Sequence, residues 1–161
     1  MRKLKLYLDT SVISHLDAPD VPEKMADTLS FWSAVRAGRY DIVLSSVTTA
    51  ELARCSEPKR TVLNTLLSEV DFDIVPADDR VLEIANRFLE MGILHPKSFD
   101  DCQHIAAAIV SRCDAIVSWN FKHIVNHRTM GGVRVIAVME HLPDMLVMSP
   151  SSFMEGDKDD T

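Results

Sequence analysis

The sequence has no long apolar run, few cysteines and no excess of basic residues. No stretch approaches the ~18 apolar residues that span a bilayer. The N-terminal segment alternates polar and apolar residues, unlike the continuous apolar stretch of a signal peptide. We therefore expect no membrane span, no export and a cytoplasmic location. The three cysteines, Cys55, Cys102 and Cys113, match no metal-binding spacing, and their odd number favours a reducing compartment.

Acidic residues outnumber basic ones. The chain has 17 Lys and Arg against 24 Asp and Glu, a formal net charge of −7. Phosphate-binding surfaces are usually basic, so this balance argues against a nucleic-acid partner. Two features weaken that objection. Part of the charge lies in the C-terminal segment EGDKDDT, which we expect to form a disordered acidic tail over 155–161. Carboxylates that bind a divalent cation also do not repel phosphate as free charges would.

The apolar pattern alternates between strands and helices along the chain. The expected strands are 3–9, 41–46, 72–77, 114–120 and 133–138. The expected helices are 22–38, 49–56, 59–69, 81–92 and 101–113. Such alternation predicts an α/β fold with a central, mainly parallel five-stranded sheet covered by helices. With 161 residues, the chain is expected to form a single domain over 1–154.

Oxygen-bearing side chains lie near the ends of these elements at four places. Asp9 ends the first strand, and Glu51 follows the second. Asp100 and Asp101 open the helix before the fourth strand, which Asn120 ends. The carboxyl ends of parallel strands share one edge of a sheet, so these side chains can meet there. Two unit charges ~4 Å apart interact by about 4 kcal/mol at an effective dielectric of 20, so clustered acids require a counter-ion. Oxygen ligands without Cys or His favour Mg²⁺ or Mn²⁺ over zinc.

Each of these residues also has a purely structural interpretation, because short polar side chains are common at helix ends and turns. The alternatives are a helix N-cap at Asp9, a capping box with Thr48 as N-cap and Glu51 at its third position, an acidic first helix turn at 100–101 and a chain turn at Asn120.

Four stretches together resemble the PIN-domain family, and especially the VapC-like toxins of bacterial toxin–antitoxin pairs. They are YLDTSVIS (7–14), SSVTTAEL (45–52), SFDDCQHIAAA (98–108) and AIVSWNFKHI (115–124), in the order that the family shows. The resemblance implies a PIN-like three-layer sandwich and an endoribonuclease that depends on Mg²⁺ (or Mn²⁺). It also implies an RNA substrate, a cognate antitoxin protein and a homodimer.

The resemblance also assigns roles to the matching residues. Asp9, Glu51 and Asp101 match the three acidic positions most typical of the family. Asp9 and Asp101 would bind the metal, and Glu51 would complete the shell or orient the attacking water. Asn120 departs from the fourth acid that many members carry, and its amide oxygen would position a water without adding charge.

Residues around the acids have lesser expected roles. The supporting residues are Ser11, Ser118 and Asp100, of which Asp100 is the neighbour that would exchange roles with Asp101. Arg54 and Lys122 are candidates for contact with substrate phosphate, and the alternative for both is solvated surface. His104 is predicted to be a packed or surface residue rather than a ligand.

Other functional classes fit less well. A haloacid-dehalogenase-type phosphatase needs a second aspartate two residues after the first, where this chain has Ser11. A receiver domain needs a pair of early acids, which is absent. The remaining alternative is a catalytically degenerate PIN domain that binds RNA or protein, which Asn120 and the acidic balance keep open. The intact set of Asp9, Glu51 and Asp101 favours the active nuclease.

Overall fold

A five-stranded sheet forms the centre of the fold. The computed structural model describes residues 2–153, and the tail predicted over 155–161 lies outside them. The strands, in the spatial order β3-β2-β1-β4-β5, are β1 (Leu4–Leu8), β2 (Tyr40–Ser45), β3 (Asp73–Val75), β4 (Ala115–Val117) and β5 (Leu146–Met148). Every neighbouring pair is parallel, which confirms the predicted type of sheet.

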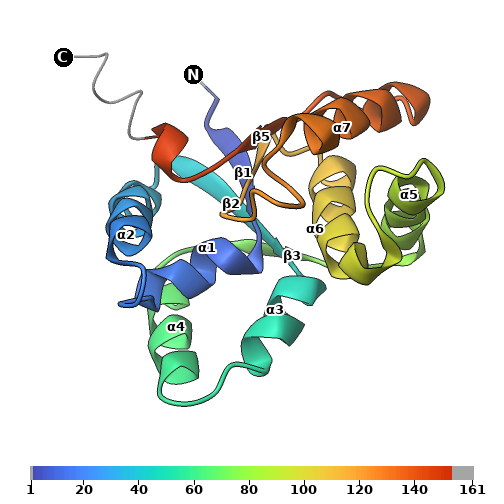
Figure 1. Cartoon of the computed structure of the whole chain (residues 1–161). Helices are drawn as coiled ribbons and strands as arrows, with labels where there is room; N and C mark the ends of the chain where they lie inside the picture. Colours follow the sequence, from blue (N-terminus) through green and yellow to red (C-terminus); the bar gives the residue numbers. More distant parts are fainter. Residues whose placement is uncertain (1, 154–161) are drawn as a thin grey trace.

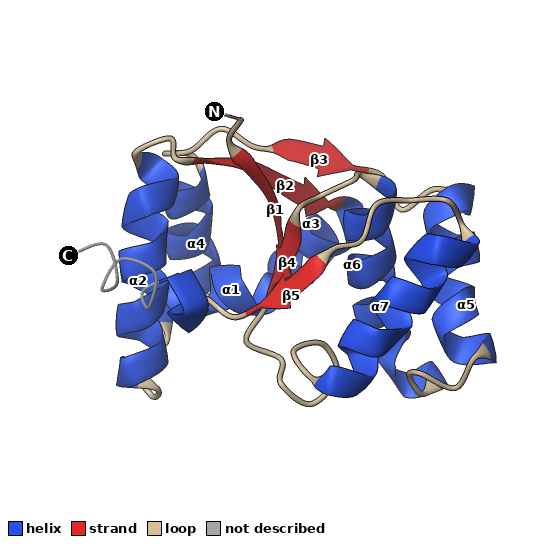
Figure 2. Ribbon diagram, turned by 90° about the horizontal axis from the view of Figure 1, so that it is seen from above, coloured by secondary structure: helices blue, strands red, loops and turns tan. Residues whose placement is uncertain are grey.

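Helices cover both faces of the sheet and complete the predicted three-layer sandwich (Figures 1 and 2). One side carries α1 (Thr10–Ser14), α2 (Pro22–Arg36) and α4 (Lys59–Leu67). The other carries α5 (Asp79–Glu90), α6 (Phe99–Val110) and α7 (His127–Met139). The remaining elements are α3 (Ser46–Ala53) and the short 3₁₀ turns η1 (His15–Asp17) and η2 (Pro96–Ser98). Within residues 2–153, no helix combines the length and apolarity needed to cross a bilayer.

The central strand β1 contributes to the cores on both faces, because successive side chains of a strand point to opposite sides. Leu6 and Leu8 pack with residues of α1, α2 and α4. Tyr7 packs with residues of α5, α6 and α7 on the other face. All three side chains are fully buried. The strand is therefore fixed from both sides at the point where it ends.

The segment 133–138, predicted as the fifth strand, belongs to α7 instead. Val133 and Ile136 are fully buried, whereas Val135 is 45% exposed and Val138 is 72% exposed. Burial three residues apart is helical spacing, and packing of that face outweighs the strand preference of the valines and isoleucine. The fifth strand is β5, which pairs with β4.

This assignment predicts opposite results for two neighbouring residues. Ile136→Ala should lower the free energy of unfolding by about 2–5 kcal/mol, because it opens a cavity in the core. Val135→Ala should change it by less than about 0.5 kcal/mol, because the side chain is largely in solvent. Urea denaturation of both variants measures the difference. A strand at 133–138 would bury Val135 with Val133, so a large loss in Val135→Ala would contradict the helix.

Candidate active site

Asp9 lies directly after β1 and is only 3% exposed. Its Oδ1 accepts hydrogen bonds from Ser11 Oγ at 2.6 Å and from the backbone N–H of Val12 at 3.3 Å. Its Oδ2 accepts a hydrogen bond from Ser118 Oγ. Burial raises the pKa of Asp9, although His104 and the two serines oppose this shift. Asp9 is therefore the N-cap of α1, which is the structural role considered for it in the sequence analysis. The two serines predicted to support it, Ser11 and Ser118, both donate hydrogen bonds to its carboxylate.

The same serines attach the loop after β4 to the end of β1. Ser11 Oγ accepts a hydrogen bond from the Trp119 backbone N–H at 2.9 Å. Ser118 Oγ accepts one from the Asn120 backbone N–H, also at 2.9 Å. The Asn120 side-chain oxygen accepts from the backbone N–H of His123 at 2.9 Å, so this residue forms the chain turn considered as its alternative.

The capping box of α3 does not include Glu51. Ser45, the last residue of β2, is the N-cap and accepts from Val47 N at 3.2 Å. Thr48 occupies the third position, and its hydroxyl accepts from Ser45 N at 3.4 Å. The predicted box with Thr48 as N-cap is therefore wrong, because α3 begins at Ser46 rather than near residue 49. Glu51 lies one turn beyond the cap, which leaves its carboxylate for other contacts.

Glu51 is held by a hydrogen-bonded chain of side chains that crosses the site. Its Oε1 accepts from His104 Nε2 at 2.6 Å and from Thr10 Oγ1 at 3.1 Å. Because the carboxylate only accepts, Nε2 is the donor of this hydrogen bond, and Nδ1 on the other side of the ring lies 2.6 Å from the Tyr7 hydroxyl. The Tyr7 hydroxyl also lies 2.7 Å from Ser45 Oγ. Burial raises the pKa of Glu51, but the hydrogen bond and attraction of His104 outweigh it and leave that pKa lowered.

Three of the four residues that hold Glu51 were given no role in the sequence analysis, and the fourth was given a different one. Thr10, Tyr7 and Ser45 were not singled out, while His104 was expected to be packed or on the surface. His104 is indeed packed, with 2% exposure, but it contacts the acid directly. One signal was available: His104 lies three residues after Asp101, and residues at that spacing share a helix face.

Asp101 lies half-buried in the first turn of α6. The pKa of Asp101 is raised, chiefly by burial. The charges of Asp9 and Glu51 also raise it, and those of His104 and His123 oppose the shift. The three predicted acids therefore share one electrostatic environment. Within the described residues, no group donates a hydrogen bond to the Asp101 carboxylate. The neighbouring carboxylate of Asp100 is exposed and accepts only from Gln103 Nε2 at 3.4 Å.

The donor set fits a hard divalent cation by its chemistry. Within residues 2–153, no three Asp, Glu, His or Cys side chains lie close enough to one another to hold a metal ion together. Carboxylate oxygens are nevertheless the ligands that Mg²⁺ and Mn²⁺ prefer. Asp101 has no hydrogen-bond donor in the described part of the chain, and Glu51 uses only Oε1 there. A cation would also relieve the repulsion that raises the pKa of Asp101.

The side chains of the two predicted basic residues are both exposed. Arg54 is the C-cap of α3 and is exposed. Together with Glu51, Asp100 and Gln103 it lines a shallow hollow of ≈ 290 Å³. Lys122 is exposed in the turn that follows Asn120. The structure thus places Arg54 beside α3 and Lys122 in the loop after β4.

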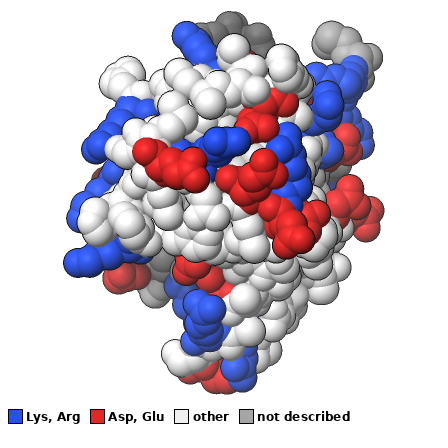
Figure 3. All heavy atoms as spheres, turned by 90° about the vertical axis from the view of Figure 1, so that its right-hand side faces the viewer, with Lys and Arg blue, Asp and Glu red and all other residues white. Residues whose placement is uncertain are grey.

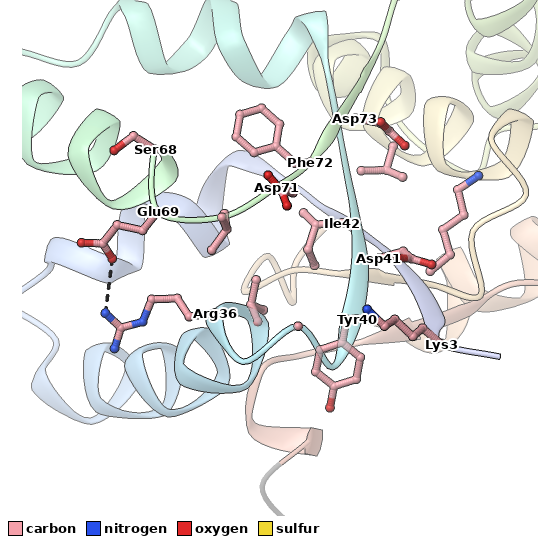
Figure 4. A pocket seen from close by; sticks show the side chains of 15 residues that line it. Lys3, Arg36, Tyr40, Asp41, Ile42, Ser68, Glu69, Asp71, Phe72 and Asp73 are labelled. Carbon is pink, nitrogen blue, oxygen red and sulfur yellow. Dashed lines mark hydrogen bonds and ion pairs between the residues drawn. The ribbon is translucent and has the colours of Figure 1, made fainter. Parts of the chain in front are cut away.

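A larger hollow than the one beside Glu51 lies elsewhere in the described chain. It has a volume of ≈ 630 Å³ and is lined by residues at the starts of β1, β2 and β3, among them Lys3, Tyr40 and Asp73. Figure 4 shows side chains of both charges around it, with an ion pair of 3.2 Å between Arg36 and Glu69. Because the sheet is parallel, the starts of its strands form the edge opposite Asp9. None of the predicted site residues lines this hollow.

The face formed by α5 and α7 carries charges in pairs. Glu140 forms ion pairs with Arg80 at 3.1 Å and with Arg87 at 3.4 Å, so one acid joins two basic residues. Basic and acidic atoms are interspersed across this side of the molecule (Figure 3). Phosphate binding relies on clustered basic residues, so this face gives no indication of a nucleic-acid surface.

The solved structures with a similar fold include two toxin–antitoxin proteins. VapBC2 from Rickettsia felis, solved bound to a DNA fragment from its promoter, has a TM-score of 0.56 at 15% identity, over 91% of this chain and 98% of that chain. VapC20 from Mycobacterium tuberculosis, described as a Sarcin-Ricin loop cleaving toxin, has a TM-score of 0.55 at 15% identity, over 73% of this chain and 92% of that chain. At this identity the likeness shows the fold alone. Comparison with curated proteins gives no match. The sequence itself matches the PIN domain over residues 6–122, and the chain therefore belongs to the PIN-domain family, as its four motifs predicted.

Proposed function

We propose that this protein is an endoribonuclease that hydrolyses RNA phosphodiester bonds with Mg²⁺ or Mn²⁺ as cofactor, and that it is the cytoplasmic toxin of a toxin–antitoxin pair. The observation that carries the proposal is that hydrogen bonds join the segments that bear the three acids: Glu51 accepts from Thr10, the neighbour of Asp9, and from His104, one helical turn after Asp101. Membership of the PIN-domain family supports the nuclease chemistry. The likeness to VapC20, a Sarcin-Ricin loop cleaving toxin, supports the role as a toxin.

In this proposal Asp9 and Asp101 hold the cation, and Glu51 completes the shell or orients the attacking water. A bound divalent cation would polarise the phosphoryl group and stabilise the leaving oxygen. Ser11 and Ser118 keep the Asp9 carboxylate in one orientation, because they donate to different oxygens. His104 and Thr10 hold Oε1 of Glu51, which leaves Oε2 to accept a hydrogen bond from water.

The surrounding polar residues would act on the substrate and its water. Asn120 would position a water through its side-chain amide, in addition to capping its own turn. Arg54 and Lys122 would contact substrate phosphates from the two sides of the site. Asp100 would support the neighbouring acid, and it would replace Asp101 as a ligand if the two exchanged roles.

Metal removal gives the direct test. The purified protein should cleave RNA in Mg²⁺ or Mn²⁺, and EDTA should stop cleavage, because it removes the cation that polarises the phosphoryl group. Asp101→Asn should lower both cleavage and Mn²⁺ affinity, each by more than about 100-fold, since loss of a supporting partner alone costs about 10–100-fold. Cleavage assays and calorimetric titration with Mn²⁺ measure the two effects. The matched control is Asp79→Asn, an exposed acid in the first turn of α5.

Two outcomes would change the proposal. A larger loss in Asp100→Asn than in Asp101→Asn would make Asp100 the ligand. A protein that binds RNA but cleaves none of a diverse set with either metal would instead be a degenerate PIN domain that serves as a binding module.

The toxin role has a separate test, because a housekeeping ribonuclease could use the same site. We expect a small DNA-binding antitoxin to be encoded beside this gene, and expression of this chain alone to stop growth. Co-expression of that neighbour should restore growth. The homodimer proposed from the family resemblance is measured by sedimentation of the purified protein. Growth that continues on expression of a protein that cleaves RNA in vitro would separate the nuclease from the toxin role.

A further inference from the structure

An aromatic side chain is exposed immediately beside the proposed site. Phe121 follows Asn120 in the loop after β4 and is 47% exposed. The ring of Trp119 meets it edge-on, with centroids 6.2 Å apart and planes at 63°. The Lys24 ammonium, from the first turn of α2, lies 5.6 Å from the centroid of Trp119 and 5.7 Å from that of Phe121. Two rings and a cation thus meet at the surface between α2 and this loop, a group that we call the aromatic subsite (Lys24, Trp119 and Phe121).

Hydrogen bonds hold both sides of the aromatic subsite. Trp119 Nε1 donates to Thr28 Oγ1 at 2.8 Å, and that hydroxyl donates to the Lys24 carbonyl at 2.6 Å. The ring of Trp119 is therefore attached to the same helix turn that carries Lys24. On the other side, the side-chain N–H₂ of Asn126 donates to the carbonyl of Phe121 at 3.1 Å. An aromatic ring that is already positioned loses little conformational entropy when a ligand stacks on it.

The aromatic subsite is also connected to Asp9. The Trp119 backbone N–H donates to Ser11 Oγ, and the Ser11 hydroxyl donates to the Asp9 carboxylate. Two consecutive hydrogen bonds therefore fix the start of this loop relative to the proposed metal ligand. A nucleotide whose phosphate lies at Asp9 would have its neighbouring base within reach of the residues that directly follow Trp119.

We propose that an unpaired base of the RNA substrate, adjacent to the phosphodiester that is cleaved, stacks on Phe121 while Lys24 neutralises a nearby phosphate. This inference rests on the proposed nuclease function. Bases of single-stranded RNA stack on exposed aromatic side chains, whereas paired bases are hidden within the helix. Stacking is tolerant of sequence because every base has a π-face. The subsite therefore selects for unpaired RNA rather than for one base.

Binding of short fluorescent single-stranded RNA of random sequence, measured by anisotropy in EDTA, tests the stacking. Phe121→Ala should weaken binding by about 5- to 150-fold, the range found when a stacking aromatic is removed. Phe121→Tyr keeps the ring and should bind within about two-fold of wild type. The matched control is Met91→Ala, a 43% exposed residue at the C-cap of α5. In Figure 1, α5 and α2 lie on opposite flanks of the sheet.

The salt dependence of the same binding separates stacking from charge. Lys24→Gln should reduce the slope of log affinity against log salt by about 1, as expected for loss of one phosphate contact. Phe121→Ala should leave that slope unchanged while it weakens binding at every salt concentration. RNA with 2-aminopurine beside the cleavage position should lose fluorescence on binding to wild type, and this quenching should be absent with Phe121→Ala.

The outcomes distinguish this inference from the proposed function. If wild type cleaves RNA and Phe121→Ala binds and cleaves as well as wild type, the stacking inference is overturned and the nuclease stands. If Phe121→Ala changes only the sedimentation of the protein, the aromatic subsite is a protein interface and the inference is likewise overturned. If wild type neither binds nor cleaves RNA, both are overturned.

Discussion

Asp9→Asn is expected to lower kcat/KM for RNA cleavage by more than about 10³-fold, because a metal-ligand interaction contributes several kcal/mol to the transition state. The substitution removes the charge of the most buried acid of the site while it keeps the shape of the side chain. Asparagine can still accept hydrogen bonds from Ser11 and the backbone of Val12, so the N-cap of α1 should persist. Single-turnover cleavage in Mg²⁺, with wild-type protein measured in parallel, gives the ratio.

The stability of the same variant provides a control through its pH dependence. In metal-free protein, burial raises the pKa of Asp9 above the value of about 3.9 for an unfolded aspartate. The folded state then binds this proton more tightly than the unfolded state. The contribution of Asp9 to the free energy of unfolding therefore falls as the pH rises from about 3.9 through the folded pKa.

Asp9→Asn lacks this titration, so the stability of wild type minus that of Asp9→Asn should decline over that interval and then stay constant. Urea denaturation in EDTA at a series of pH values measures the difference. A difference that is independent of pH would mean that Asp9 is not buried as described. Cleavage retained by a correctly folded Asp9→Asn would remove this residue from the proposed site.

His104→Ala is the second substitution with a large expected effect, in this case on both stability and activity. It removes a buried ring that hydrogen-bonds to both the Glu51 carboxylate and the Tyr7 hydroxyl. Truncation of a large buried side chain and the loss of partners for buried polar groups together predict a decrease of about 2–5 kcal/mol in the free energy of unfolding. Cleavage should fall by about 10–100-fold, the range for residues that orient a metal-site carboxylate.

Tyr7→Phe separates these two effects. It removes only the hydroxyl that lies between His104 and Ser45 and should lower the free energy of unfolding by about 1–2 kcal/mol. Its activity should exceed that of His104→Ala, because the contact between His104 and Glu51 remains. Denaturation and kcat/KM are measured for both variants. Equal losses of activity in the two would indicate that stability alone, rather than the orientation of Glu51, sets the rate.

The parallel type of the sheet followed from sequence because the alternation of strands and helices is a local signal, and the meeting of the three acids at one edge is an expectation that rests on the same signal. Asp9 directly follows a buried strand, and Asp101 opens a strongly apolar helix, so the parallel sheet brings both to one edge. The fifth strand was missed because β5 is short and half exposed, whereas the valines and isoleucine within α7 have the composition of a strand.

The contacts of Glu51 could not be derived from sequence. They depend on where α3 begins, and the SSVTT stretch offers several hydroxyls that can cap a helix. Only the packed structure shows that Ser45 is the cap and that Glu51 turns toward His104. Likewise, the contact between Lys24 and the loop after β4 joins residues that are far apart in the chain. Side-chain partners at such separations are set by tertiary packing rather than by local pattern.

The position of β1 has a consequence for the motions of the molecule. This strand is hydrogen-bonded to β2 on one side and to β4 on the other, and the Asp9 backbone N–H continues the pairing to the Val117 carbonyl at 3.3 Å. Strands paired on both sides and buried on both faces belong to the parts of a fold that open last. Asp9 therefore belongs to the slowest-opening unit of the protein. Surface loops around it can rearrange for a bound molecule without displacing this carboxylate.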